Sequence, residues 1–318
     1  MTSAAISNHP DTAEGRVYQP IELGGIVAGV DGSPESLAAL TTASTIASLR
    51  TCAMHIVSVV PPSDSYHVDP IMGQSDSQGD SQIESLRINI RTMGIKAILE
   101  KANPDHKWTH EVVSGRVPRA IVSAAENRLA EFIVVGKRRN VPMDKFLGGE
   151  TTLQVIQMSA VPVLAVEKPL GEPRTVVVAT DFSQASTLAA RLALSLMGNQ
   201  GTLYLVHVEP VMDVELMQSG NPQPLRFPGD LVVWFRRQVQ GLDVPSGVIV
   251  ETAALSGKPA HEVLEFAVRA GADLIATGAH RQPDRERFLL GSVSTAIARN
   301  AECAVLVAPP QVHKRAYR

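Results

Sequence analysis

Two glycine-containing stretches carry residue types that could hold a phosphate. Gly136 and Gly278 each end an apolar run, and a second glycine follows each of them thirteen residues later. Glycine lets the backbone come close to a ligand, and the free N–H groups at a helix N-terminus favour an anion such as phosphate. Asp31 and Asp181 end two other apolar runs. A carboxylate there can accept hydrogen bonds from a ribose hydroxyl or a base amino group, so these residue types indicate nucleotide binding.

Each of these residues also has a purely structural interpretation, which the sequence leaves open. Gly136 could serve only the backbone angles of a turn. Asp31 or Ser33 could cap the helix that follows. The basic clusters 137–139 and 280–281 fall on loops that we expect to be exposed, where charged side chains are normally solvated.

The sequence contains an internal duplication. Asp31 and Asp181 lie 150 residues apart, whereas Gly136 and Gly278 lie 142 residues apart, as do all later matched positions. One difference in length, between the second and third strands, explains both offsets. Because chance similarity would not keep this register, we predict two copies of one structural unit.

Each copy alternates short, β-branched apolar runs with helical patterns. This alternation predicts an α/β fold with two repeated, doubly wound, five-stranded parallel sheets of the Rossmann-like type. In such sheets, ligands bind beyond the carboxyl ends of the strands, where the candidate residues fall. Strands are expected at 25–31, 54–60, 109–113, 132–136 and 161–166, and then at 175–180, 202–208, 247–254, 273–278 and 303–308. Helices in the first copy are expected at 34–49, 82–102, 117–130 and 149–158.

The domain boundaries follow from the repeat and from a polar, proline-rich junction. We predict a first domain at 23–168, a linker at 169–173 and a second domain at 174–310. A flexible N-terminus at 1–22 and a tail at 311–318 complete the expected organisation.

The overall composition excludes several classes of protein. Charged residues make up 19% of the chain and the net charge is −3, so neither nucleic acid nor a membrane is expected as a partner. The two cysteines and nine histidines form no metal-binding pattern and fit a reducing cytoplasm. A signal peptide and a membrane-spanning segment are not expected. No residue set suggests catalysis, because neither a nucleophile elbow nor a Walker A loop occurs.

At its glycines the chain resembles the universal stress protein family, in a tandem form with two UspA-type domains. Members that bind ATP carry glycine, two residues, glycine, nine residues, and then glycine followed by serine or threonine. The spacing is intact in both copies, but arginine replaces the second glycine as Arg139 and Arg281. Arginine removes room for a phosphate yet supplies a planar cation suited to one. The first copy also has Glu150 where the family has serine or threonine, and this carboxylate would repel a phosphate.

The resemblance implies ATP, with Mg²⁺, as the ligand, and favours the second copy as its site. Asp181 and Val208 would contact adenine or ribose, and glycines would hold phosphates. The implied positions in the second copy are Ala179, Thr180, Asp181, Val208, Gly278, His280, Arg281, Gly291, Ser292, Val293 and Ser294. The less favoured positions in the first copy are Val30, Asp31, Val59, Gly136, Arg139 and Gly149.

Three functional hypotheses follow from these residues. The leading one is a binding or regulatory protein of the stress response. The alternative is a protein whose pockets are closed by Arg139 and Arg281 and which acts through protein partners. A slow ATPase, with Asp181 and His280 as candidates, ranks last because no general base or metal-binding carboxylate pair is evident.

The last strands of the two copies are expected to pair with each other. The segments 161–166 and 304–308 are apolar edge strands at equivalent positions, and such edges need to be covered. The resemblance implies that they form an intramolecular pseudo-dimer. Association of two chains into a homodimer is a further expectation.

Overall fold

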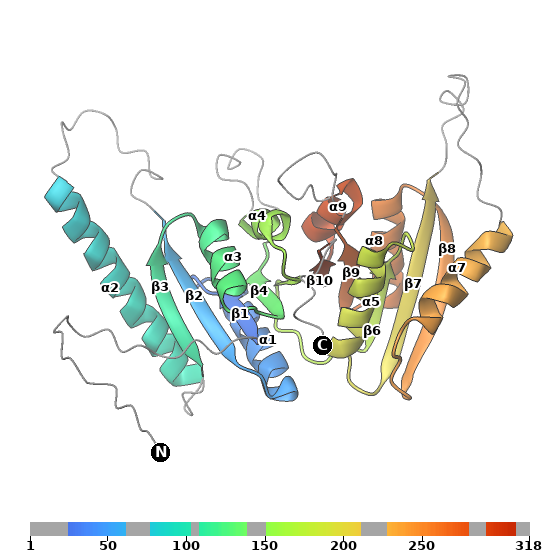
Figure 1. Cartoon of the computed structure of the whole chain (residues 1–318), viewed down its shortest axis with the longest axis horizontal. Coiled ribbons are helices and arrows are strands. Elements are labelled where there is room, and N and C mark those ends of the chain that lie inside the picture. The colour runs from blue at the N-terminus through green and yellow to red at the C-terminus, as the bar shows by residue number, and fades with distance from the viewer. Residues whose placement is uncertain are drawn as a thin grey trace, which may run out of the picture.

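One continuous sheet organises the chain. The computed structural model describes residues 25–61, 77–102, 108–138, 151–210, 228–279 and 291–309. Within these residues the strands form a 10-stranded sheet in the order β3-β2-β1-β4-β5-β10-β9-β6-β7-β8 (Figure 1). All neighbouring strands are parallel except β5 and β10. The predicted α/β class with a doubly wound, largely parallel sheet is therefore confirmed.

The first five strands and their helices make up the first unit. Its strands are β1 (Ile26–Gly29), β2 (Met54–Val60), β3 (Thr109–Ser114), β4 (Phe132–Gly136) and β5 (Val163–Val166). Its helices are α1 (Pro34–Arg50), α2 (Ser77–Ala102), α3 (Val117–Asn127) and α4 (Thr151–Met158).

The second unit repeats this order. Its strands are β6 (Thr175–Ala179), β7 (Gly201–Pro210), β8 (Val248–Gly257), β9 (Leu274–Gly278) and β10 (Ala304–Ala308). Its helices are α5 (Gln184–Leu196), α7 (Pro228–Gln240), α8 (Pro259–Ala270) and α9 (Ser292–Asn300). Among the described helices, none is both long enough and apolar enough to cross a membrane.

Helices cover both faces of the sheet, and each face has its own apolar core. One core contains side chains of α1, α2, α5 and α7, and the other contains those of α3, α4, α8 and α9. Alternate residues of a strand point to opposite faces, so Ile26 and Ala28 enter the first core and Val27 enters the second. Both cores run from one unit into the other.

Local signals in the sequence explain where the helices begin. Ser33 caps α1 and Ser183 caps α5, each accepting a hydrogen bond from a backbone N–H three residues later. Proline lies in the first turn of α3 and of α8, where its missing N–H costs nothing. Helix α2 begins at Ser77, five residues before its expected start.

The two units meet at the antiparallel pair of β5 and β10. Leu164 lies opposite Leu306 in this pair, and both side chains are fully buried. This is the strand pairing that the sequence predicts. Arg50 of α1 adds a polar contact between the units by donating to the hydroxyl of Ser195 at 2.6 Å.

Candidate ligand-binding site

A cleft of about 400 Å³ opens at the carboxyl ends of β1, β2 and β4 in the first unit. Small-molecule sites usually have volumes of about 300–1,000 Å³, so this cleft is large enough for a ligand. The predicted residues Val30, Asp31, Val59 and Gly136 line it together. Arg139 and Gly149, predicted for the same site, lie outside the described residues, as does Glu150.

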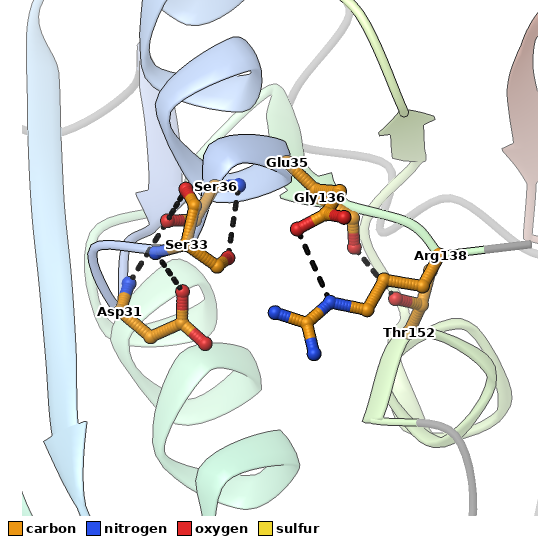
Figure 2. A network of polar contacts seen from close by, with 7 residues as sticks. All are labelled: Asp31, Ser33, Glu35, Ser36, Gly136, Arg138 and Thr152. Carbon is orange, nitrogen blue, oxygen red and sulfur yellow. Dashed lines mark hydrogen bonds and ion pairs between the residues drawn. The ribbon is translucent and has the colours of Figure 1, made fainter. Parts of the chain in front are cut away.

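A hydrogen-bonded turn at the end of β1 shapes one wall of this cleft (Figure 2). The Oδ1 of Asp31 accepts the backbone N–H of Ser33 at 2.9 Å, and the hydroxyl of Ser33 accepts the backbone N–H of Ser36 at 3.3 Å. Ser33, rather than Asp31, is therefore the helix cap. Asp31 holds the turn that brings the cap into place.

Arg138 and Glu35 form an ion pair beside this turn, with 3.1 Å between Nε and Oε2 (Figure 2). A second guanidinium, that of Arg91 on α2, donates to the backbone carbonyl of Asp31 at 2.6 Å. Both arginines line the cleft and come from different elements. Arg91 was not predicted as a site residue, because its partner Asp31 lies 60 residues away in the chain.

The pKa of the Asp31 carboxyl group lies below its ordinary value. Partial burial would raise its pKa, but hydrogen bonds from Ser33 and Ser36 and the charge of Arg138 outweigh that effect and lower it. A carboxyl group with a lowered pKa stabilises the fold above its unfolded pKa of about 3.9. That contribution is lost as the pH falls through the folded pKa.

We therefore expect the Asp31→Asn variant to be less stable than the wild type at neutral pH and equally stable in acid. The charge lost in the variant is the one that the turn and Arg138 stabilise, and protonation removes the same charge from the wild type. Urea denaturation between about pH 7 and pH 2.5 would measure this, with the two stability curves converging below about pH 4. In the control variant Glu126→Gln, on the exposed face of α3, no such convergence is expected. Parallel curves for Asp31→Asn would contradict the prediction.

The second unit has a smaller pocket of about 170 Å³ at the equivalent strand ends. It brings together seven of the predicted residues: Ala179, Thr180, Asp181, Val208, Gly278, Val293 and Ser294. Gly291 and Ser292 are described but are not among its lining residues, and His280 and Arg281 lie outside the described residues. His207 and Thr277 also line the pocket and were not predicted.

An aromatic side chain at the first turn distinguishes the second pocket from the first. Phe182 occupies the position of Gly32, and both residues have left-handed backbone angles, with φ of 64° and 84°. This conformation is unfavourable for phenylalanine, but its ring contacts His207, Trp234 and Phe235 with centroids 4.8, 6.0 and 5.1 Å away. The aromatic cluster stabilises the turn of the second unit, whereas glycine forms the corresponding turn without cost.

Gly136 and Gly278 lie where the backbone at the first turn of a helix, α1 or α5, comes very close. A Cβ atom on Gly136 would lie 2.6 Å from the carbonyl carbon of Glu35, and one on Gly278 would lie 2.6 Å from that of Ala185. Each glycine carbonyl also accepts a hydroxyl hydrogen bond, from Thr152 at 2.7 Å and from Ser294 at 2.8 Å. Close packing against the first turn of α1 or α5 therefore requires glycine, whether or not a phosphate binds nearby.

One residue of the basic cluster 137–139, Lys137, is buried, contrary to the expectation that the cluster is solvated. Lys137 is only 3% exposed and donates from Nζ to the carbonyl of Ala301 at 2.6 Å. That carbonyl lies at the C-terminal end of α9, where a cation is favourable. Lys137 is thus a contact between the two units rather than a solvated charge, while the neighbouring Arg138 is exposed.

Metal chemistry finds no support in the described residues. Across these residues, no three histidine, cysteine, aspartate or glutamate side chains are grouped closely enough to hold a metal ion.

Comparisons with known proteins agree with the duplicated fold. A sequence profile of the universal stress protein family matches residues 24–167 and again residues 172–309. A universal stress protein of Mycobacterium tuberculosis is 28% identical over 306 residues, which covers 91% of this chain and 98% of that protein. One from Methanocaldococcus jannaschii is 32% identical over 140 residues, or 42% of this chain and 81% of that protein. The crystal structure of a universal stress protein from Archaeoglobus fulgidus superposes with a TM-score of 0.59 at 19% identity, covering 90% of this chain and 98% of the other.

Proposed function

Because this chain belongs to the universal stress protein family along both of its units, we propose that it is a regulatory protein that binds an adenine nucleotide. The carboxyl ends of the strands form the binding region, and the first-unit cleft is the main site. This ranking reverses the one that the sequence motifs favour. The two units act as an intramolecular pseudo-dimer joined through β5 and β10.

The first cleft combines a volume suited to a nucleotide with two arginine side chains in its lining, and this combination supports the proposal. The first cleft has a volume of about 400 Å³ and is lined by Arg91 and Arg138, whereas the second pocket has about 170 Å³ and no arginine among its described lining residues. A guanidinium binds phosphate through two parallel hydrogen bonds and keeps its charge at all physiological pH values. The apolar side chains of Val30 and Val59, at the carboxyl ends of β1 and β2, supply contacts for a flat base.

Binding, rather than catalysis, is the activity that the cleft supports. The carboxylates of Asp31 and Glu35 are both engaged, one by the backbone of Ser33 and the other by Arg138. Hydrogen bonds and charge lower the pKa of each, so neither is suited to act as a general base near neutral pH. We therefore assign no catalytic residue.

Isothermal titration calorimetry with Mg-ATP and with adenosine tests this proposal. In the Arg91→Ala variant, the dissociation constant for ATP is expected to rise about tenfold or more, which is the effect of losing one charge-assisted hydrogen bond. Adenosine affinity is expected to stay nearly unchanged because adenosine has no phosphate. The matched control is Arg87→Ala, which removes an arginine one turn away on the same helix that does not line the cleft.

Two outcomes would contradict the proposal. A folded wild-type protein that shows neither heat of binding nor a raised thermal midpoint at millimolar ATP would exclude nucleotide binding. Loss of ATP binding in Asp181→Ala, with Arg91→Ala unaffected, would move the main site to the second unit.

A further inference from the structure

Helix α2 is much longer than the part of the sheet that it covers. It has 26 residues, whereas its counterpart α7 in the second unit has 13. At 1.5 Å per residue, α2 is about 39 Å long, and the six-residue edge strand β3 beside it is about 20 Å long. Figure 1 shows the N-terminal half of α2 leaning away from this edge of the sheet. No described side chain from Ile83 to Gly94 is buried.

A row of large apolar side chains exposed to water runs from the projecting N-terminal half of α2 into the start of its C-terminal half. Ile83, Leu86, Ile90 and Met93 are 56%, 59%, 62% and 73% exposed. An isolated helical stretch of this length is marginal without packing, and an apolar row of this kind marks an interaction site. We call these four residues the α2 seam.

The spacing of the α2 seam is that of a coiled coil. Its members are separated by three, four and three residues, so they occupy the a, d, a and d positions of two heptads. Isoleucine stands at both a positions and leucine at the first d position. In parallel coiled coils, this combination favours two strands.

The opposite side of the same helix packs on the sheet. Ile95, which is 1% exposed and belongs to the core, falls at an f position, directly across the helix from a and d. A partner helix on the seam would therefore lie on the far side of α2 from β3. Two copies of the chain can meet through their seams without their sheets colliding.

One pair of positions beside the seam is small and uncharged in a parallel arrangement. Asn89 at a g position would face Gly94 at the e position of the partner helix, which places no like charges together and allows close approach. In a two-fold dimer each seam meets an identical seam, so one apolar row suffices for both partners.

We propose that the α2 seam is the interface of a homodimer in which two α2 helices pair in parallel. Two heptads are fewer than a free coiled coil needs. Each α2 helix is already folded against its own sheet, however, so association does not have to supply the free energy of helix formation. The small contact falls below the roughly 1,200 Å² of a standard stable interface. The dimer is therefore weak and dissociates on dilution.

Sedimentation equilibrium of the full chain tests the proposal. The wild type is expected to shift with concentration from 34.0 kDa towards twice that mass. The Ile90→Lys variant is expected to weaken dimerisation at least 30-fold, the effect of removing one central hot-spot residue. Val233→Lys is the matched control because Val233 is a 54% exposed apolar residue on α7, outside the seam. It should dimerise like the wild type.

A cysteine variant tests the parallel orientation. In Ile90→Cys, the two new thiols face each other across a parallel, in-register pair, and oxidation should give a disulfide-linked dimer. Val233→Cys should remain uncrosslinked. A wild type that stays at 34.0 kDa up to about 100 µM, where a dimer with a Kd at or below that concentration would be well populated, would overturn the proposal and would favour coverage of the seam by the same chain. Undiminished dimerisation of a folded Ile90→Lys variant would overturn it as well.

Discussion

Replacing Gly136 or Gly278 with alanine is expected to destabilise the protein by about 1–3 kcal/mol each, the usual cost of overpacking a tight site. The added methyl group would meet backbone atoms, not a flexible side chain. At Gly136 it would lie 2.6 and 2.7 Å from the carbonyl carbon and oxygen of Glu35, and at Gly278 it would lie 2.7 Å from the amide nitrogen of Ser186. Relief of these contacts requires the first turn of α1 or α5 to move.

That movement has a functional consequence in the first unit. The first turn of α1 carries Ser33, Glu35 and Ser36, which orient Asp31 and Arg138 in the cleft. Gly136→Ala is therefore expected to weaken ligand binding as well as stability. Gly278→Ala is expected to lower stability to a similar extent and to leave the first cleft unchanged.

Urea denaturation followed by circular dichroism measures the stability of these variants. Gly171→Ala is the matched control because a Cβ atom there would meet nothing within 4 Å and the backbone does not have a positive φ. Its stability is expected to stay within about 0.5 kcal/mol of the wild type, as for most surface substitutions. If Gly136→Ala and Gly278→Ala were both as stable as the wild type, the first turns of α1 and α5 would be able to move away from the added methyl groups, and the prediction would be wrong.

The repeat and most of the strands could be predicted because both depend on local patterns. Apolar runs with β-branched residues become buried strands, and the matched spacing of Asp31 and Asp181 is visible without a structure. The pairing of β5 with β10 was also predictable, since two apolar edge strands at equivalent positions need covering. The helix starts were predictable as well, because a capping serine or a first-turn proline affects only the backbone within one helical turn of itself.

Contacts between distant residues set the limit of sequence prediction in the site. The burial of Lys137 depends on a carbonyl 164 residues away, and the sequence around it looks like an exposed basic loop. The role of Gly136 was ambiguous for the same reason. A glycine required by close packing against Glu35 has the same sequence context as one required by a phosphate, and only the backbone distance separates the two.

Replacing either leucine at the junction between the units with alanine is expected to lower the free energy of unfolding by about 2–5 kcal/mol. Leu164 on β5 and Leu306 on β10 lie directly opposite each other, both 0% exposed, in a core that runs through both units. Leu164→Ala or Leu306→Ala removes apolar contacts and leaves a cavity between the two halves of the sheet. Urea denaturation of both single variants and of the double variant gives the coupling between them.

The coupling is expected to be about 0.5–3 kcal/mol, because residues in direct contact share the cavity that either change creates. The control is a second double variant, which combines Leu164→Ala with Leu203→Ala. Leu203 is an equally buried leucine on β7, four strands away from β5, so at about 4.8 Å per strand it lies roughly 19 Å distant. These two changes should be additive to within about 0.5 kcal/mol.

Each unit contains one tryptophan, so the fluorescence of Trp108 and Trp234 can show whether the leucine changes at the junction reduce the cooperativity of unfolding between the units. Trp108 precedes β3 and packs against the core, whereas Trp234 lies on α7 beside Phe182. Because a large apolar junction couples two units into one folding unit, single-tryptophan variants of the wild type should show coincident unfolding transitions. With both leucines changed to alanine, the junction is weakened more than either core, and the transitions seen by Trp108 and Trp234 should separate. Coincident transitions in the double variant would mean that Arg50, Lys137 and the remaining strand contacts suffice to hold the halves together.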